Sequence, residues 1–182
     1  FGNAVSTTTT INSSYGSKVV VEGAGFLLNN EMDDFSSKIG EPNQFGLIGS
    51  DANKIEPNKR MQSSMSPTII LKDNKPVLVV GSPGGSTIST VVLQVILNVL
   101  NFGMNIQQAI NMPKIHHQWL PDQIDYEIFG LSVDVKKSLL ERGHFLGNRR
   151  SLGRVEGIFI DENENTFLGA TDPRGYGKAS SY

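Results

Sequence analysis

The chain has 182 residues, of which 38% are hydrophobic and 19% are charged, with a formal net charge of −2. This balance is typical of a soluble globular protein and excludes both a disordered chain and a basic nucleic-acid-binding footprint. The absence of cysteine excludes a disulfide framework, a cysteine nucleophile and thiolate metal sites. The longest apolar run, residues 88–100, is too short to cross a bilayer.

The start of the chain indicates processing. It begins with Phe1, and its first residues lack the charged and apolar regions of a signal peptide. We therefore expect that the chain was cut from a precursor or that its first residues are missing from the sequence. No linker or internal repeat interrupts it, so one domain spanning residues 1–182 is predicted.

The first third of the chain predicts short strands and one long loop. Threonine-rich residues 2–10 favour a strand, because β-branched side chains suit a pleated surface. Two further short strands are expected at residues 18–22 and 25–28. Residues 36–60 contain several glycines and prolines, so we expect a long ordered loop there, a feature that in compact domains is often functional.

The rest of the chain predicts two hairpins that enclose three helices. One hairpin joins strands 68–72 and 76–80 across Asp73-Asn74, and the other joins 154–160 and 166–170 across 161–165. Helical periodicity and capping residues predict helices at 88–102, 106–112 and 132–142. Strands, then helices, then strands indicate an α+β fold with layered antiparallel sheets.

The most informative segment is the sequence Gly-Ser-Pro-Gly-Gly-Ser at residues 81–86. It lies between a predicted apolar strand and the longest predicted helix. Glycines at such a junction expose consecutive backbone N–H groups, which can form a cradle for an anion or an oxyanion. The alternative is that the glycines only turn the chain tightly before the helix.

Two polar clusters are candidates for binding. The run Glu31-Met32-Asp33-Asp34 places three carboxylates within four residues. It could bind a substrate ammonium group or a cation, or it could be a solvated turn; the spacing of a calcium loop is absent. The pair Ser63-Ser64 could hold a carboxylate or form a hydroxyl-stabilised turn before a strand.

Other nucleophile and metal patterns are weak. No serine lies in a Gly-x-Ser-x-Gly elbow, so serine-nucleophile chemistry is unsupported. The adjacent His116 and His117 would point to opposite faces of an extended segment, so they cannot both face one metal ion. Asp172 and Arg174 are expected to form a structural pair.

These pieces, in this order, resemble the small subunit of the γ-glutamyltranspeptidase family. The matching motifs run through nearly the whole chain and lie at residues 2–5, 10–12, 28–35, 58–60, 63–68, 81–86, 116–121 and 172–174. One departure is Thr87, which stands where many bacterial members carry arginine.

The resemblance implies an N-terminal-nucleophile hydrolase fold, a four-layer αββα sandwich of two antiparallel sheets flanked by helices. It implies a precursor that cuts itself into a large and a small subunit, with this chain in the small, catalytic one. The nucleophile would be a threonine about nine residues before Phe1, activated by its own free α-amine. That threonine is absent from this chain.

The resemblance also implies roles for particular residues. Thr10 would support the nucleophile, and Gly84 and Gly85 would form the oxyanion hole. Substrate would be bound by six residues: Asn12, Glu31 and Asp34 for the α-amino end, Ser63 and Ser64 for the α-carboxylate, and Phe45 as an aromatic that covers the pocket. No cofactor and no metal is implied.

The implied activity is γ-glutamyl transfer from glutathione and related compounds to water, amino acids or peptides. The implied partner is the large subunit of the same precursor, in a heterodimer or a dimer of heterodimers, in the periplasm or outside the cell. Neither nucleic acid nor a membrane span is expected. The alternatives are a related acylase, cephalosporin-acylase-like or capsule-processing, and a non-catalytic truncated subunit.

Overall fold

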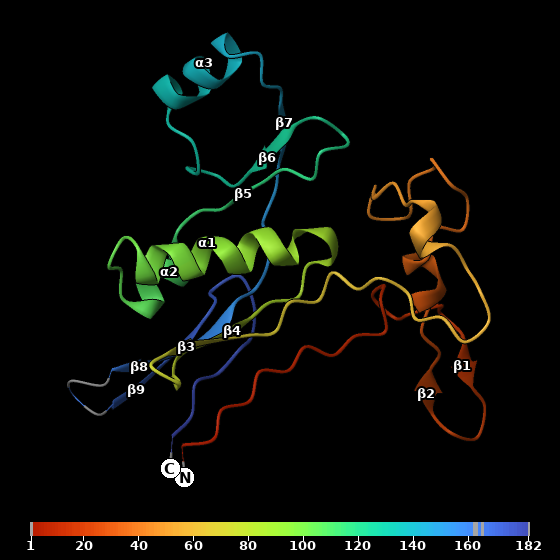
Figure 1. Cartoon of the computed structure of the whole chain (residues 1–182), viewed down its shortest axis with the longest axis horizontal. Helices are drawn as coiled ribbons and strands as arrows, with labels where there is room; N and C mark the ends of the chain where they lie inside the picture. Colours follow the sequence, from red (N-terminus) through yellow and green to blue (C-terminus); the bar gives the residue numbers. More distant parts are fainter. Residues whose placement is uncertain (1, 162–163, 165, 182) are drawn as a thin grey trace. The chain divides into compact units, whose positions relative to one another are not determined.

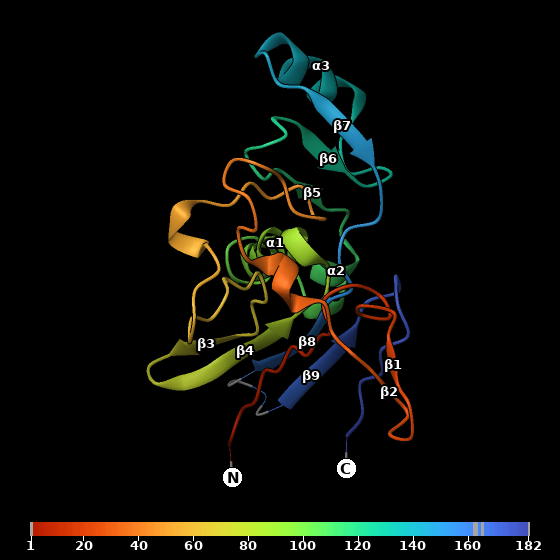
Figure 2. The same cartoon turned by 90° about the vertical axis from the view of Figure 1, so that its right-hand side faces the viewer.

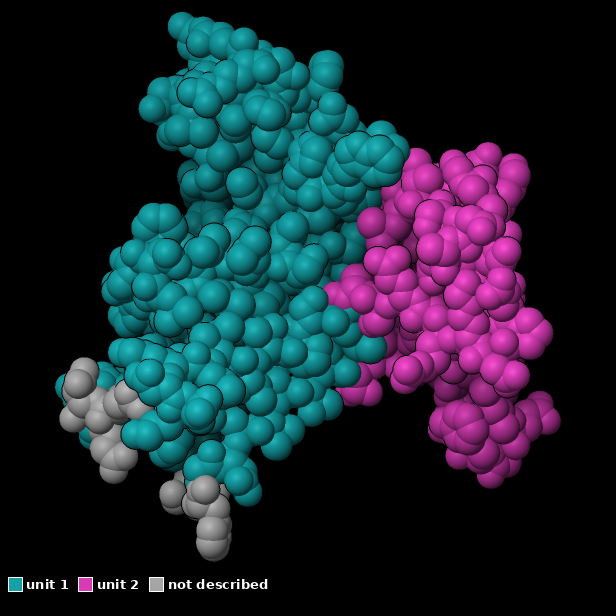
Figure 3. Space-filling model, in the orientation of Figure 1, with its two compact units in different colours: residues 1–8, 65–182 teal, residues 9–64 magenta. Residues whose placement is uncertain are grey.

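The computed structural model describes residues 2–161, 164 and 166–181. By internal contacts the chain divides into two compact units (Figure 3), Phe1–Thr8 with Met65–Tyr182, and Thr9–Ser64. We call them unit 1 and unit 2 and describe each by itself. The expectation of one domain over residues 1–182 stays a prediction.

Unit 1 is built on a four-stranded antiparallel sheet with the order β3-β4-β8-β9. The strands are β3 (Thr68–Lys72), β4 (Lys75–Gly81), β8 (Glu156–Asp161) and β9 (Thr166–Thr171). Both predicted hairpins are confirmed by the pairings of β3 with β4 and of β8 with β9. In the turn of the second hairpin, residues 162, 163 and 165 lie outside the described residues.

Two helices cover one face of this sheet (Figures 1 and 2), α1 (Ile88–Leu100) and α2 (Ile106–Asn111). Val91 and Val95 of α1 are fully buried, and burying such a side chain stabilises a fold by roughly 1.5–3 kcal/mol. On β8, a Cβ atom at Gly157 would lie 3.1 Å from Ile106. The absence of a side chain there lets α2 approach the sheet closely.

A second, three-stranded sheet in unit 1 has the order β5-β6-β7. It contains β5 (Ile115–His116), β6 (Ile124–Tyr126) and β7 (Leu146–Arg149), and α3 (Val133–Glu141) lies between β6 and β7 in the chain. On α3, the Lys136 ammonium lies 4.8 Å from the centre of the Tyr126 ring. All three predicted helices are confirmed, whereas these short strands were not predicted.

Unit 2 has few regular elements: β1 (Val20–Val21), β2 (Phe26–Leu27), and the 3-10 helices η1 (Glu31–Asp34) and η2 (Asp51–Asn53). The two short predicted strands are confirmed, and β1 pairs with β2. The long loop at 36–60 is confirmed as well, interrupted by η2 and two isolated bridges.

The predicted strand at residues 2–10 is wrong. Among the described residues, this segment pairs with no strand. Its attachment to unit 1 instead includes a side chain, because the Ser6 hydroxyl donates to the Val80 carbonyl at 3.2 Å. A strand requires a backbone ladder as well as β-branched side chains.

No helix in the described part of the chain is long and apolar enough to span a membrane.

Candidate functional site

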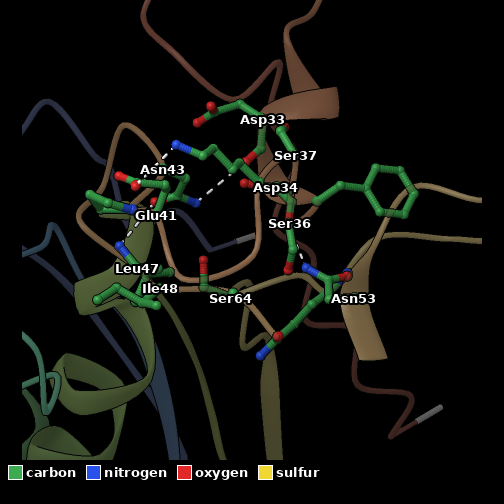
Figure 4. A pocket seen from close by; sticks show the side chains of 15 residues that line it. Asp33, Asp34, Ser36, Ser37, Glu41, Asn43, Leu47, Ile48, Asn53 and Ser64 are labelled. Atoms are coloured by element: carbon green, nitrogen blue, oxygen red, sulfur yellow. Dashed lines mark hydrogen bonds and ion pairs between the residues drawn. The ribbon is translucent and has the colours of Figure 1, made fainter. Parts of the chain in front are cut away.

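A cavity of about 220 Å³ lies in unit 2 around the end of η1. Figure 4 shows Asp34, Ser36, Asn53 and Ser64 around the same hollow. These side chains come from η1 and the loop that follows it, from η2, and from the last residues of the unit. The cavity therefore brings a carboxylate, an amide and hydroxyl groups together from segments far apart in the sequence.

The two carboxylates predicted to bind an ammonium group interact with each other. Their side chains share a hydrogen bond. Burial, followed by the charge and the hydrogen bond of Asp34, raises the pKa of Glu31. Burial also raises the pKa of Asp34, although the hydrogen bond from Glu31 acts in the opposite direction. Two such carboxylates form a negative site that a bound cation would neutralise.

An amide network fixes the backbone that leads into η1. Thr10 Oγ1 accepts from the Asn12 N–H at 2.8 Å, and the Asn12 side chain donates to the Asn30 carbonyl at 3.1 Å. Asn30 in turn exchanges two hydrogen bonds with Ser13. The structure thus links Thr10 and Asn12 to the residue directly before Glu31.

The other predicted binding residues are placed differently. Ser64 lines the cavity, whereas Ser63 and Phe45 are not among its described lining residues. Phe45 is partly buried in the long loop, where its N–H donates to Asn43 Oδ1 at 3.0 Å. A covering role for Phe45 therefore stays a prediction.

Asn53 is a site residue that the sequence did not indicate. Its side chain donates to the Asp34 carbonyl at 2.7 Å and accepts from the Gln62 N–H at 2.9 Å. One amide therefore connects the end of η1 to the segment before the two serines. The only signal in the sequence was an amide in a long loop, which is common in turns.

The glycine turn in unit 1 has the features of an anion cradle. Gly84 is exposed and Gly85 is partly buried. Among the described residues, the N–H groups of these two glycines have no hydrogen-bond acceptor. Two accessible and unpaired N–H groups in succession can donate to an oxyanion.

The backbone of this turn requires glycine. Gly84 has φ +147° and Gly85 has φ +58°, conformations that side chains disfavour. Thr87, the residue that departs from the family pattern, is buried, and its hydroxyl donates to the Gly84 carbonyl at 2.9 Å. Thr87 therefore helps to fix the turn that precedes α1.

In the described part of the chain, no cluster of histidines and carboxylates could hold a metal ion.

Comparison with known proteins identifies the family. The model of the family described as Gamma-glutamyltranspeptidase matches residues 1–182. This chain belongs to the γ-glutamyltranspeptidase family. It is 48% identical to the glutathione hydrolase proenzyme of Escherichia coli over 95% of this chain and 30% of that protein. The chain thus spans about a third of the length of this relative.

Solved γ-glutamyltranspeptidases confirm the fold class, α+β of the N-terminal-nucleophile hydrolase type. One from Helicobacter pylori, a mutant, is 56% identical, with a TM-score of 0.92 over 96% of this chain and 95% of that one. One from Pseudomonas nitroreducens is 47% identical, with a TM-score of 0.93 over 100% of this chain and 94% of that one.

Two other solved structures, of a transpeptidase and of a cephalosporin acylase, are more distant in sequence. The transpeptidase CapD of Bacillus anthracis is 27% identical, with a TM-score of 0.75 over 100% of this chain and 94% of that one. A cephalosporin acylase from Bacillus halodurans is also 27% identical, with a TM-score of 0.80 over 95% of this chain and 31% of that one. The comparisons therefore favour γ-glutamyltranspeptidase over both.

Proposed function

We propose that this chain is the catalytic part of an enzyme that transfers γ-glutamyl groups from glutathione and related compounds. The acceptor is water, an amino acid or a peptide. The observation that carries the proposal is the unit 2 cavity, which places Asp34, hydrogen-bonded to Glu31, in one hollow with Ser64.

The chemistry of this cavity suits an α-amino acid head group. An ammonium group is attracted by two neighbouring carboxylates in a partly buried site. Burial raises the pKa of both Glu31 and Asp34, and neighbouring carboxylate charges add to the rise. The α-carboxylate is assigned to Ser63 and Ser64, whose hydroxyl and N–H groups can donate to it. Asn12 supports this arrangement through its hydrogen bond to the Asn30 carbonyl before η1, and Thr10 accepts from the Asn12 N–H.

The reaction proceeds through a γ-glutamyl ester. The threonine nucleophile belongs to the preceding part of the precursor; its hydroxyl oxygen attacks the γ-carbonyl carbon, and its α-amine takes the proton. The N–H groups of Gly84 and Gly85 donate to the oxyanion that develops. The leaving amine departs protonated, and water or an acceptor amine then attacks the ester and releases the threonine.

The partner is the large subunit of the same precursor. On the sheet face opposite α1 and α2, several apolar side chains are exposed, among them Ile69 (39%), Ile158 (43%) and Phe167 (71%). A row of exposed apolar side chains on one sheet face indicates a surface that another layer covers. In a four-layer sandwich this layer is the second sheet, which we assign to the rest of the complete precursor. We also propose that the precursor is exported to the periplasm or secreted.

Donor selectivity tests the proposal in the complete processed enzyme. Two chromogenic anilides serve as donors: the γ-glutamyl anilide, and the glutaryl anilide, which lacks only the α-amine. Asp34→Asn should lower kcat/KM for the γ-glutamyl donor by about 10- to 100-fold, because it removes a charge-assisted hydrogen bond. The glutaryl donor should lose about threefold at most.

Asp51→Asn is the matched control, since Asp51 is an exposed carboxylate of unit 2 outside the cavity lining. It should leave both donors unaffected. An equal loss on the two donors in Asp34→Asn would contradict ammonium recognition. A correctly processed wild-type enzyme without γ-glutamyl transfer would favour the non-catalytic alternative.

A further inference from the structure

A network of four charged side chains, three of them buried and one partly buried, lies in unit 1, remote in sequence from the glycine turn. Glu127 receives two hydrogen bonds from the Arg174 guanidinium, at 2.7 and 2.6 Å. Asp172 receives one from this guanidinium at 3.0 Å and one from the Arg174 N–H at 2.9 Å. The fourth member, Lys114, lies 3.6 Å from Asp172. Two cations and two anions balance each other, so the network carries no net charge.

The carboxylates of this network also bind the backbone of residues 152–155. Glu127 Oε1 accepts from the Leu152 N–H at 2.8 Å, and Asp172 Oδ2 accepts from the Val155 N–H at 2.9 Å. Leu152 and Val155 are themselves buried. Their N–H groups would be costly to leave unpaired, so the two carboxylates fix this segment at both ends.

The same segment contacts the glycine turn. The Arg154 N–H donates to Ser82 Oγ at 3.0 Å, and the Ser82 hydroxyl donates to the Pro83 carbonyl at 2.7 Å. Gly153 approaches so closely that a Cβ atom there would lie 2.8 Å from Ser82 Oγ. Ser82, which is 3% exposed, therefore joins the segment to the turn.

Within the described part of the chain, few other side chains fix the turn. Gly84 and Gly85 have no side chains to pack, and Thr87 also bonds the turn's backbone through its hydroxyl. The direction of an oxyanion donor must be accurate, because a displacement of about 1 Å can cost about 100-fold in rate. The support of Ser82 thus bears directly on the two N–H groups.

We infer that Ser82, Glu127 and Asp172 are positioning residues for the Gly84 and Gly85 N–H donors. This inference rests on the proposed function. The carboxylates hold residues 152–155, this segment holds Ser82, and Ser82 holds the turn. The network acts on the transition state, in which the oxyanion forms, and not on donor binding.

Ser82→Ala in the complete processed enzyme tests this inference with a small change that leaves the charge network intact. We expect kcat for the γ-glutamyl anilide to fall about 10- to 100-fold, with KM changed less than about twofold. Asp172→Asn, measured in parallel, should also lower kcat. Asp125→Asn is the matched control. Asp125 lies on β6 and, like Asp172, is a buried carboxylate, but its ion-pair partner Arg150 lies outside residues 152–155.

Amide hydrogen exchange supplies a readout that does not depend on activity. The N–H groups of Thr87 and Ile88 donate to the carbonyls of Gly84 and Gly85. In Ser82→Ala these N–H groups should exchange about tenfold faster than in the wild type, because the turn loses its support. In Asp125→Asn they should exchange at the wild-type rate.

Unchanged exchange and unchanged kcat in Ser82→Ala would overturn the inference. So would a rise in KM as large as the fall in kcat, or the same changes in the Asp125→Asn control. A wild-type enzyme without γ-glutamyl transfer would refute the proposed function alone, since the exchange of Thr87 and Ile88 still decides whether Ser82 supports the turn.

Discussion

At the scale of single residues, the glycine turn shows how little space the donor geometry leaves. A Cβ atom at Gly84 would lie 2.6 Å from the Thr87 hydroxyl, which donates to the Gly84 carbonyl. The φ of +147° at Gly84 is a second obstacle to any side chain. Steric contact and backbone conformation therefore both select glycine there.

Gly84→Ala should consequently lower turnover by about 100-fold, because the N–H donor is displaced. Turnover and thermal unfolding of the processed enzyme would be measured together. Gly103→Ala is the control: Gly103 also has a positive φ, but a Cβ atom there would meet no described atom within 4 Å. It should destabilise the protein without a comparable loss of turnover; equal losses of turnover would argue against a role for Gly84.

The Glu31 and Asp34 carboxylates predict how donor binding depends on pH. The pKa of each is raised, so each stays protonated to a higher pH than an ordinary carboxyl group. An ammonium donor needs the ionised forms. As the pH is lowered, KM for the γ-glutamyl anilide should therefore begin to rise while the pH is still above 4.5, the ordinary pKa of glutamate.

Asp33→Asn should move this rise to lower pH, because the charge of Asp33 raises the pKa of Asp34. The glutaryl anilide, which lacks the ammonium group, serves as the reference donor and should show no such rise. A KM profile that is the same for both donors would contradict the prediction.

Some site residues could be predicted from the sequence and others could not. Gly84, Gly85, Glu31 and Asp34 stand in motifs whose residue types are uncommon in combination, and their roles in the site stay predictions. Asn53 and Ser82 each form a hydrogen bond with a backbone group far along the chain. An amide or a hydroxyl in a loop carries no signal for such a contact.

At the scale of elements, sequence patterns were sufficient to predict those helices and turns whose stabilising interactions are between neighbours in sequence. The apolar period of α1 and the Asp73-Asn74 turn between β3 and β4 depend on neighbours in sequence. Both turn residues have positive φ, 49° and 62°, as a type I′ hairpin turn requires. Strands β5, β6 and β7 depend on distant partners, so short apolar runs alone could not reveal them.

The hairpin turn gives a stability prediction. Asn74→Val should lower the free energy of unfolding by roughly 1–2 kcal/mol, because a β-branched residue disfavours the left-handed conformation. Denaturant unfolding of the processed enzyme would measure it. Lys72→Val, an exposed position on the adjacent strand, should have little effect, and equal losses would show that the turn conformation is not the cause.

At the scale of the whole molecule, the buried charge network makes the stability of unit 1 sensitive to acid. Burial would raise the pKa values of Glu127 and Asp172, but hydrogen bonds from Arg174 and from backbone N–H groups outweigh it and lower both. Burial lowers the pKa of Lys114 below its ordinary value of 10.5, and the charge of Arg174 acts in the same direction.

A carboxylate with a lowered pKa stabilises the fold above its ordinary value, and this stabilisation is lost as the pH falls through the folded-state pKa. The free energy of unfolding should therefore decline below about pH 4.5, the ordinary value for Glu127. Glu127→Gln should be less stable at pH 7 and should show a shallower decline. Denaturant unfolding between pH 3 and 7 would check this; parallel profiles for the two proteins would contradict it.

The long reach of these contacts sets an order of events during synthesis. Arg174 binds the carbonyl of Ile110, 64 residues earlier, and the Arg154 N–H reaches Ser82 across 72 residues. A ribosome must therefore release almost the whole of unit 1 before α2 and the glycine turn gain these partners. Until then the network of Lys114, Glu127, Asp172 and Arg174 is incomplete, so α2 and the glycine turn reach their final packing late in translation.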